Sequence, residues 1–348
     1  MNIKKHKAAA CLSVFLLTAV ILVSTVSCRS ELSAEFTGFA MDTVISVKLY
    51  GCSDPERSLS SVNRIFKETE QQISRHYQGS DVSRLNSGET LTPDEPFLLL
   101  LEKNLEMWKK TGGLFDITSG PLIDLWNIGS GSERVPEPDE IKAALEDISS
   151  ERISVSGNQL TLKPGTVMDL GASGKGYVLD LIRAYLSETD TLGACISAGG
   201  SVLLYGTHDG KKTYSVAVRH PDDGAAYLGM LTLSDCTVST SGDYERCFFA
   251  DGRRYHHILS PFTGYPAETG LRSVTIVSPD GTMSDILSTA VFLLGKERGL
   301  SLLSDYNAEG ILVSDDHTVT VTQGLQDRFR LTADGYTLEI YEGLLEAR

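Results

Sequence analysis

Asp285 and Thr289 are a pair of residues whose types and spacing could bind a metal ion. They lie four residues apart in a segment, 282–294, whose apolar pattern predicts a helix, so both side chains should lie on one helix face. Both offer oxygen atoms, and sites made of oxygen ligands suit hard cations such as Mg²⁺. Two side chains are too few for a metal site, and Asp285 could instead interact with the helix dipole. Spacing alone leaves both interpretations open.

A glycine-rich turn near the middle of the chain, 171–176, could supply a third ligand through a backbone carbonyl. Asp169 precedes the turn, Lys175 lies near its end, and residues 177–186 have the apolar spacing of a helix. Glycines allow a close backbone approach, and the first N–H groups of a helix favour an anion. The turn lacks both the P-loop spacing and the GxSxG frame of a nucleophile elbow, so those two motifs are excluded.

Three further segments carry candidate ligand contacts. Asp116 lies between two large apolar residues in a turn-rich segment, which is typical of either a helix cap or a ligand contact. His76 or Tyr77, in a polar loop, could stack on a planar ligand or simply face water. His257 belongs to a segment, 256–266, that two prolines make rigid.

The composition limits the partners that these residues could serve. The chain has 348 residues, of which 41% are hydrophobic and 22% charged, as expected for one large globular domain or two small ones. Its formal net charge of -15 argues against nucleic acid as a partner. An acidic protein also repels a free phosphate group, so a phosphate ligand would need a local device such as a metal ion.

The N-terminus has the pattern of a targeting segment. Lysines precede an apolar run, 8–26, and the small residues that follow lead to Cys28, as in a bacterial lipobox. Thr25 departs from that pattern, because a larger aliphatic residue is usual there. We predict a lipoprotein signal peptide over 1–27, lipidation of Cys28 and a tether over 28–34; an uncleaved membrane anchor is the alternative. Both interpretations place the globular part at a cell membrane, on the extracytoplasmic side.

The remaining cysteines do not predict a metal site. Cys52, Cys195, Cys236 and Cys247 lack the paired spacing of zinc ligands. A disulfide is possible outside the cell, but we favour small buried thiols, because a chain of this length can stabilise its core without a bridge.

The elements that must position the candidate residues predict an α+β fold. Apolar periodicity indicates amphipathic helices over 55–73 and 93–111, whereas alternation indicates a strand over 44–50 and a hairpin over 153–162. Strands and helices do not alternate regularly enough for a doubly wound sheet. We therefore expect mixed, largely antiparallel sheets flanked by helices, with residues 35–348 forming a single domain.

Eight motifs resemble the ApbE family, the FAD:protein FMN transferases, in family order. They cover essentially all of the chain after residue 35, and a lipoprotein signal is also usual in the family. The motifs are Met41-Asp42-Thr43, the segments 80–86, 113–122, 169–177 and 197–200, and the segments 240–244, 257–264 and 285–290.

The resemblance implies a role for each matching residue. Mg²⁺ would bind Asp285, Thr289 and the backbone carbonyl of Ala172, with Ser288 nearby, and His257 would accept a proton. The position of a flavin-stacking aromatic aligns with His76, beside Tyr77, and Ser260 stands where relatives usually have Asp. The FAD site would be lined by Met41, Leu114, Phe115, Asp116, Asp169, Lys175 and Ile258.

The activity that the resemblance implies is a Mg²⁺-dependent transfer of FMN from FAD to a threonine hydroxyl of an acceptor flavoprotein, with release of AMP. The acceptor would be a membrane electron-transfer subunit or an exposed reductase domain. Two alternatives are a Mg²⁺-dependent FAD pyrophosphatase and a flavin-binding lipoprotein without chemistry. The metal-ligand pair Asp285 and Thr289, together with His257 as a base, is superfluous for simple flavin binding. The transferase and the pyrophosphatase would need the same site, so these residues do not distinguish them.

Overall fold

The computed structural model describes residues 33–343. The predicted signal peptide over 1–27 and the lipidation site at Cys28 lie outside the described residues. Within 33–343, none of the helices is both long and apolar enough to cross a membrane.

The helices of the described chain are α2 (Pro55–Ile73), α3 (Asp81–Asn86), α4 (Glu95–Lys110), α5 (Gly120–Trp126), α6 (Pro138–Leu145), α7 (Gly174–Ser187), α8 (Gly281–Leu294) and α9 (Lys296–Leu303). The strands are β1 (Ser33–Ala40), β2 (Thr43–Tyr50), β3 (Ile153–Ser156), β4 (Gln159–Leu162), β5 (Gly193–Ala198), β6 (Ser201–Gly206), β7 (Tyr214–Arg219), β8 (Tyr227–Leu233), β9 (Cys236–Gly242), β10 (Cys247–Ala250), β11 (Arg253–His256), β12 (Leu271–Ser278), β13 (Glu309–Ser314), β14 (Thr318–Thr322), β15 (Phe329–Leu331) and β16 (Thr337–Tyr341).

The largest sheet of the described residues has nine strands in the order β1-β2-β5-β6-β9-β12-β13-β14-β16. Its neighbouring strands are antiparallel except for the parallel pair β14 and β16. Smaller sheets are formed by β15-β8-β7, β10-β11 and β3-β4. The predicted α+β class, with largely antiparallel sheets, is confirmed.

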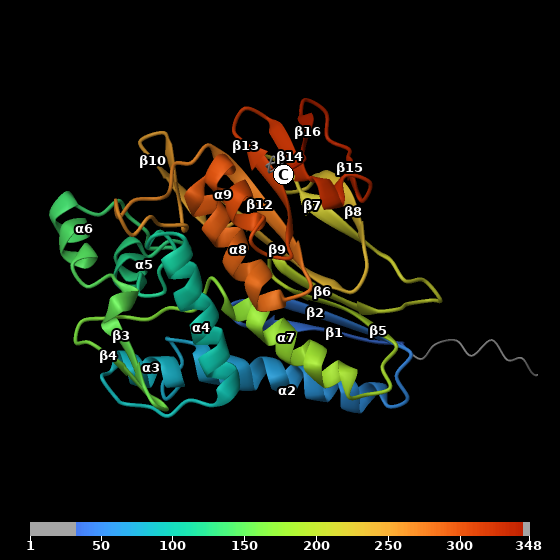
Figure 1. Cartoon of the computed structure of the whole chain (residues 1–348), viewed down its shortest axis with the longest axis horizontal. Coiled ribbons are helices and arrows are strands. Elements are labelled where there is room, and N and C mark those ends of the chain that lie inside the picture. The colour runs from blue at the N-terminus through green and yellow to red at the C-terminus, as the bar shows by residue number, and fades with distance from the viewer. Residues whose placement is uncertain (1–32, 344–348) are drawn as a thin grey trace, which may run out of the picture. The chain divides into compact units, whose positions relative to one another are not determined.

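Helices and the three-stranded sheet cover opposite faces of the nine-stranded sheet. Ile45 and Val47 of β2 pack into a core that includes residues of α2 and α7. Tyr50 lies in a second core, which includes residues of β7 and β8. This alternation follows from the two-residue period of a strand. Figure 1 shows α2 and α7 along one side of the sheet, with α8 and α4 beside them.

α8 is buried along nearly its whole length, which explains its apolar composition. Thr289 and Leu294 are its two residues that are not fully buried. The helix packs against β9, β12, α7 and α9. α8 therefore lies between the large sheet and α7, with Thr289 as its partly accessible polar position.

Two element boundaries differ from the sequence-based expectation. Ser33 and Ala34, which we assigned to the tether, pair with Tyr50 and Leu49 as the start of β1. α7 begins at Gly174 rather than at residue 177, so the glycine turn continues directly into the helix. The four cysteines of the described chain form no disulfide; Cys52 and Cys236 are buried thiols, as we predicted, whereas Cys195 and Cys247 are only half-buried.

Candidate active site

A cavity of about 900 Å³ brings most of the predicted site residues together. It lies where the β1–β2 turn, the glycine turn before α7 and α8 meet the segments around residues 116 and 257. The predicted residues that line it are Met41, His76, Leu114, Phe115, Asp116, Asp169, Ala172, Lys175, His257, Ile258, Asp285 and Thr289.

Two predicted residues of the described chain do not line this cavity. Tyr77 is 47% exposed and lies outside it, whereas the neighbouring His76 is part of its wall. Of the two candidates, His76 is therefore the one that lines the cavity, and its stacking on a planar ligand stays a prediction. Ser288 is fully buried, and its hydroxyl donates to the backbone carbonyl of Asp285 at 2.8 Å. Its side chain thus helps to fix α8 and the cavity wall.

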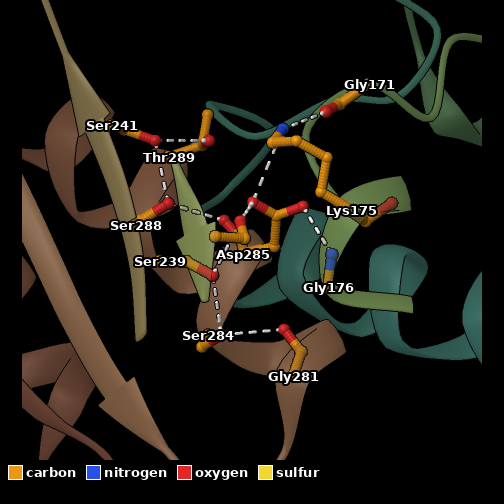
Figure 2. A network of polar contacts seen from close by, with 12 residues as sticks. Gly171, Lys175, Gly176, Ser239, Ser241, Gly281, Ser284, Asp285, Ser288 and Thr289 are labelled. Atoms are coloured by element: carbon orange, nitrogen blue, oxygen red, sulfur yellow. Dashed lines mark hydrogen bonds and ion pairs between the residues drawn. The ribbon is translucent and has the colours of Figure 1, made fainter. Parts of the chain in front are cut away.

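Asp285 is a buried carboxylate with partners from two other elements, α7 and β6 (Figure 2). Its Oδ2 accepts a hydrogen bond from the backbone N–H of Gly176 at 3.0 Å, and its Oδ1 accepts one from the hydroxyl of Ser201 at 3.2 Å. The Lys175 Nζ lies 3.7 Å from Oδ1. The anion that we expected at the start of α7 is therefore a side chain of the protein itself. Simple interaction of Asp285 with the dipole of its own helix is not its main contact.

Buried hydroxyl groups hold Asp285 and Thr289 against β9. Ser201 receives a hydrogen bond from Ser239 at 3.1 Å, and Ser239 is also 2.8 Å from Ser284. On the next turn of α8, the hydroxyl of Ser241 lies 3.1 Å from that of Thr289. Figure 2 shows the hydroxyls of Ser239 and Ser241, on β9, meeting hydroxyls of α8 on both sides of Asp285. Ser201 and Ser239 had no visible signal in the sequence, because their partners lie far along the chain.

Lys175 spans the glycine turn. Its Nζ donates to the backbone carbonyl of Gly171 at 3.3 Å while it lies near Asp285 (Figure 2). The side chain is partly accessible and lines the cavity. A positive charge is thus placed between a backbone carbonyl of the turn and the buried carboxylate.

Asp169 shapes the other end of the glycine turn. Its Oδ1 accepts a hydrogen bond from the N–H of Gly171 at 2.7 Å, and its Oδ2 lies 2.6 Å from Nε of Arg75. Arg75 also forms two hydrogen bonds with Asp124, at 2.6 and 3.0 Å. The Arg75 side chain is almost fully buried and lines the cavity. The sequence reading missed this arginine, although it stands next to His76.

Asp116 anchors its own loop. Its carboxylate accepts hydrogen bonds from the N–H and hydroxyl of Thr118 at 2.8 and 2.7 Å, and from the N–H and hydroxyl of Ser150 at 3.0 and 2.8 Å. Asp116 does not cap α5, whose N-cap is Ser119; it closes a turn with Thr118 and ties that turn to Ser150, 34 residues along the chain, while its contact with a ligand stays a prediction. Asp116 still lines the cavity and holds Leu114 and Phe115 at its wall.

His257 is oriented by a backbone carbonyl. The backbone N–H of His257 donates to the backbone carbonyl of Arg246 at 3.1 Å, and the ring Nδ1 of His257 lies 3.3 Å from the same oxygen. Because a carbonyl can only accept, Nδ1 carries the hydrogen in this pairing and Nε2 is left as the acceptor. Burial lowers the pKa of His257 to about 4, and positive charges at His256, Arg246 and Lys175 act in the same direction. The imidazole is therefore neutral near pH 7.

The β1–β2 turn closes over the same region. Met41 and Asp42 both have positive φ, 54° and 55°, as in a two-residue hairpin turn. The N–H of Met41 donates to Glu70 at 3.1 Å, and Arg246 donates to the Asp42 carboxylate at 2.8 Å. Non-glycine residues rarely adopt positive φ, and such strain gathers at functional sites. Arg246 lies two residues after the 240–244 motif, and this proximity was the signal that the sequence reading did not use.

The metal ligands predicted around Asp285 are not the usual cluster of acidic, His or Cys side chains. The described residues contain no group of three or more His, Cys, Asp or Glu side chains that could hold a metal. The predicted set instead combines one carboxylate, one hydroxyl and one backbone carbonyl. Asp285 is buried and already lies near an ammonium group, so its environment accommodates a positive charge. This donor chemistry suits a hard cation.

Comparison with known proteins identifies the family. The model of the ApbE family matches residues 41–312. The chain belongs to the ApbE family. The chain is 31% identical over 321 residues to the FAD:protein FMN transferase of Treponema pallidum, covering 85% of this chain and 89% of that protein. It is also 31% identical over 310 residues to a protein of the same name from Klebsiella pneumoniae, covering 87% and 96%.

Solved structures of ApbE proteins share the fold. The ApbE protein of Thermotoga maritima superimposes with a TM-score of 0.78 at 31% identity, over 86% of this chain and 100% of that one. The apo form of the flavinyl transferase ApbE of Pseudomonas stutzeri gives a TM-score of 0.77 at 27% identity, over 88% and 100%. The predicted ApbE family and fold are thereby confirmed, as is the enzyme class that the names of the curated relatives carry.

Proposed function

We propose that this ApbE-family chain transfers FMN from FAD to a threonine hydroxyl of an acceptor flavoprotein, with release of AMP. The observation that carries the proposal is one cavity that contains Asp285, Thr289 and His257 together with the residues predicted to line the FAD site. The names of the curated relatives support the transfer of FMN.

The proposed reaction needs a metal, for which we propose Mg²⁺. Asp285, Thr289 and the carbonyl of Ala172 would hold it, and Ser201 would orient the Asp285 carboxylate. When bound, Mg²⁺ would neutralise negative charge on the FAD pyrophosphate. That contribution matters here because the chain carries a formal net charge of -15, which disfavours the binding of the negatively charged pyrophosphate.

The protein residues would position the two reacting groups. Lys175 would contact a phosphate, and His76 would stack on a planar ring of FAD. The threonine oxygen would attack the FMN-side phosphorus, forming a new P–O bond while the bond to the AMP phosphate breaks. His257 would accept the threonine proton at Nε2, which its contact with Arg246 leaves available. Catalysis would consist mainly of positioning and charge stabilisation, as in other phosphoryl transfers.

We also propose that the mature chain is tethered to a membrane through lipid on Cys28, on the extracytoplasmic side. The lysines, apolar run and lipobox-like residues of the N-terminus support this. The acceptor would then lie on the same side, as a membrane electron-transfer subunit or an exposed reductase domain. Mass spectrometry of the mature N-terminus tests the lipid: a chain that keeps residues 1–27, or an unmodified Cys28, would contradict it.

A transfer assay tests the activity. The domain from residue 33 is incubated with FAD, Mg²⁺ and an FMN-free acceptor domain that has one flavinylation threonine, and the acceptor is weighed by mass spectrometry. We expect a gain equal to one FMN phosphoester and an equal amount of AMP. An unchanged acceptor mass, with FAD converted to free FMN and AMP, would show a pyrophosphatase instead. Binding of FAD without turnover would show a flavin-binding lipoprotein.

A further inference from the structure

Strand β7 presents a free edge to the candidate active site. In the order β15-β8-β7 it is the outer strand, and within residues 33–343 it pairs with β8 alone. Its residues from Val216 to Arg219 line the cavity that also contains His257 and Asp285. An unpaired strand edge therefore forms part of the cavity wall.

The register shows which backbone groups of β7 point outward. The N–H of Thr232 on β8 donates to the carbonyl of Arg328 at 2.9 Å, on the side of β15. Ser215 lies opposite Thr232, so these two residues form a pair without mutual backbone hydrogen bonds. Ala217 lies two residues further, opposite Met230, and has the same orientation. The N–H and C=O groups of Ser215 and Ala217 thus point away from β8, along the free edge.

The middle of this edge lacks the usual protection against pairing. Natural edge strands are commonly blocked by charged residues, proline or bulges. The outward positions of β7 carry the small, exposed residues Ser215 and Ala217. The register shift comes only between Val218 and Arg219, where the strand ends. The middle of β7 can therefore accept another strand.

Exposed apolar side chains lie beside the same cavity. Phe39 of β1 and Val44 of β2 are direct cross-strand partners, with 71% and 61% of their surfaces exposed. Val44 also lines the cavity. Side chains of paired residues share one face of the sheet, so Phe39 and Val44 form an exposed apolar surface that reaches the cavity at Val44.

We propose that the acceptor protein presents its hydroxyl-bearing segment as an extended strand that pairs with the free edge of β7. The inference rests on the proposed function and specifies how its protein substrate binds. Main-chain pairing supplies affinity, while alternate side chains of the added strand point to opposite faces. One face can therefore direct the threonine into the cavity. Phe39 and Val44 would receive an apolar side chain of the acceptor. A second copy of this chain on β7 would instead obstruct that part of the cavity.

Ala217→Pro tests the pairing. Proline removes the outward N–H of Ala217, which the β7–β8 ladder does not use, and such positions on edge strands tolerate proline. We expect the KM for the FMN-free acceptor domain to rise on the order of tenfold, the value of one hydrogen bond. The Kd for FAD should be unchanged. Ala217→Ser keeps the N–H and a small side chain, so its acceptor KM should rise much less than that of Ala217→Pro. Gly224→Ala, which lies outside the cavity lining and meets no atom within 4 Å, is the control that should behave as wild type.

Each result separates the two proposals. A wild-type protein that fails to modify the acceptor contradicts the proposed function. An active wild type with an unchanged acceptor KM in Ala217→Pro contradicts β7 pairing, as does a change confined to FAD affinity or to oligomeric state. Hydrogen exchange on the wild type provides a measurement without mutation. The Ser215 and Ala217 amides should exchange more slowly when the acceptor is saturating, and unchanged exchange would overturn the inference.

Discussion

The carboxylate of Asp285, on α8, accepts a hydrogen bond from the N–H of Gly176 in the first turn of α7, at 3.0 Å. Asp180 of α7 does the converse, since it accepts hydrogen bonds from the N–H groups of Gly281 and Thr282, both at 2.7 Å. Each helix therefore caps the N-terminus of the other. Because Asp285 is also the candidate metal ligand, helix pairing and chemistry depend on the same side chain.

Gly176→Ala should disrupt this helix pair. A Cβ at position 176 would lie 2.0 Å from the Gly281 carbonyl oxygen and 2.8 Å from the Asp285 Cβ. The backbones would have to separate, so we expect a loss of about 2–4 kcal/mol in the free energy of unfolding, measured in urea. Gly224→Ala is the control, because a Cβ there meets no atom within 4 Å. Equal stability of Gly176→Ala and wild type would show that the close approach is wrong.

Asp180→Ala should destabilise the fold more than removal of the ordinary cap of α8. The Asp180 carboxylate also accepts a hydrogen bond from the hydroxyl of Thr282 at 2.6 Å, so alanine would leave three donors without their partner. We expect the free energy of unfolding of this variant to fall by about 2–3 kcal/mol. Asp280 accepts a hydrogen bond from the N–H of Met283 at 2.8 Å and is more exposed than Asp180. Asp280→Ala should therefore lower the free energy of unfolding by only about 1 kcal/mol. Urea unfolding compares them, and the reverse order would contradict the mutual capping.

The sequence predicted elements whose signals are local. Helix α2 has the bounds that its apolar spacing indicated, 55–73, because Asp54 caps it and proline begins it. Strand β1 was missed, since its residues alternate between exposed and half-buried up to Ala40 and give no clear apolar face. The pattern of an edge strand with two accessible faces resembles that of a loop.

Site contacts between distant segments could not be predicted from local pattern. The start of α7 at Gly174 depends on packing against α8, about a hundred residues later. The Arg75–Asp169 ion pair likewise joins the 169–177 motif to a residue that lies outside every motif. Family motifs named the residues of the cavity, but they did not show that Asp116 accepts hydrogen bonds from Thr118 and the distant Ser150, or that Tyr77 lies outside the cavity.

Asp285→Asn should remove the proposed metal affinity while the fold is largely kept. An amide oxygen can still accept from Gly176, but the negative charge is lost. We expect titration calorimetry with Mg²⁺ to show binding to wild type and none to Asp285→Asn. Ser201→Ala, which removes a hydrogen bond to the carboxylate, should weaken binding by about 10- to 100-fold. Ser187→Ala, at an exposed position of α7, is the control. Wild-type Mg²⁺ affinity in Asp285→Asn would contradict the metal assignment.

The activity of the transferase should fall at a lower pH than an ordinary histidine predicts. Burial lowers the pKa of His257 to about 4, so the ring becomes protonated, and unable to accept a proton, only well below pH 6.5. We therefore expect the acid limb of kcat/KM near pH 4, and a loss of about 10²–10⁴-fold in rate for His257→Gln at neutral pH. An acid limb centred at pH 6.5, or full activity of His257→Gln, would contradict the role of this residue as base.

The same pKa shift gives His257 a signature in stability. Because its pKa is lower in the folded chain than in the unfolded one, the unfolded chain binds more protons between pH 4 and 6.5. The His257 contribution to stability is thus complete above pH 6.5 and decreases as the pH falls toward 4. Urea unfolding across this range should show a smaller pH dependence for His257→Gln than for wild type. His256→Gln should also reduce it, because burial lowers the pKa of His256 too, but this residue does not line the cavity. Its acid limb of kcat/KM should therefore remain, so that the two variants separate a base from a merely buried imidazole.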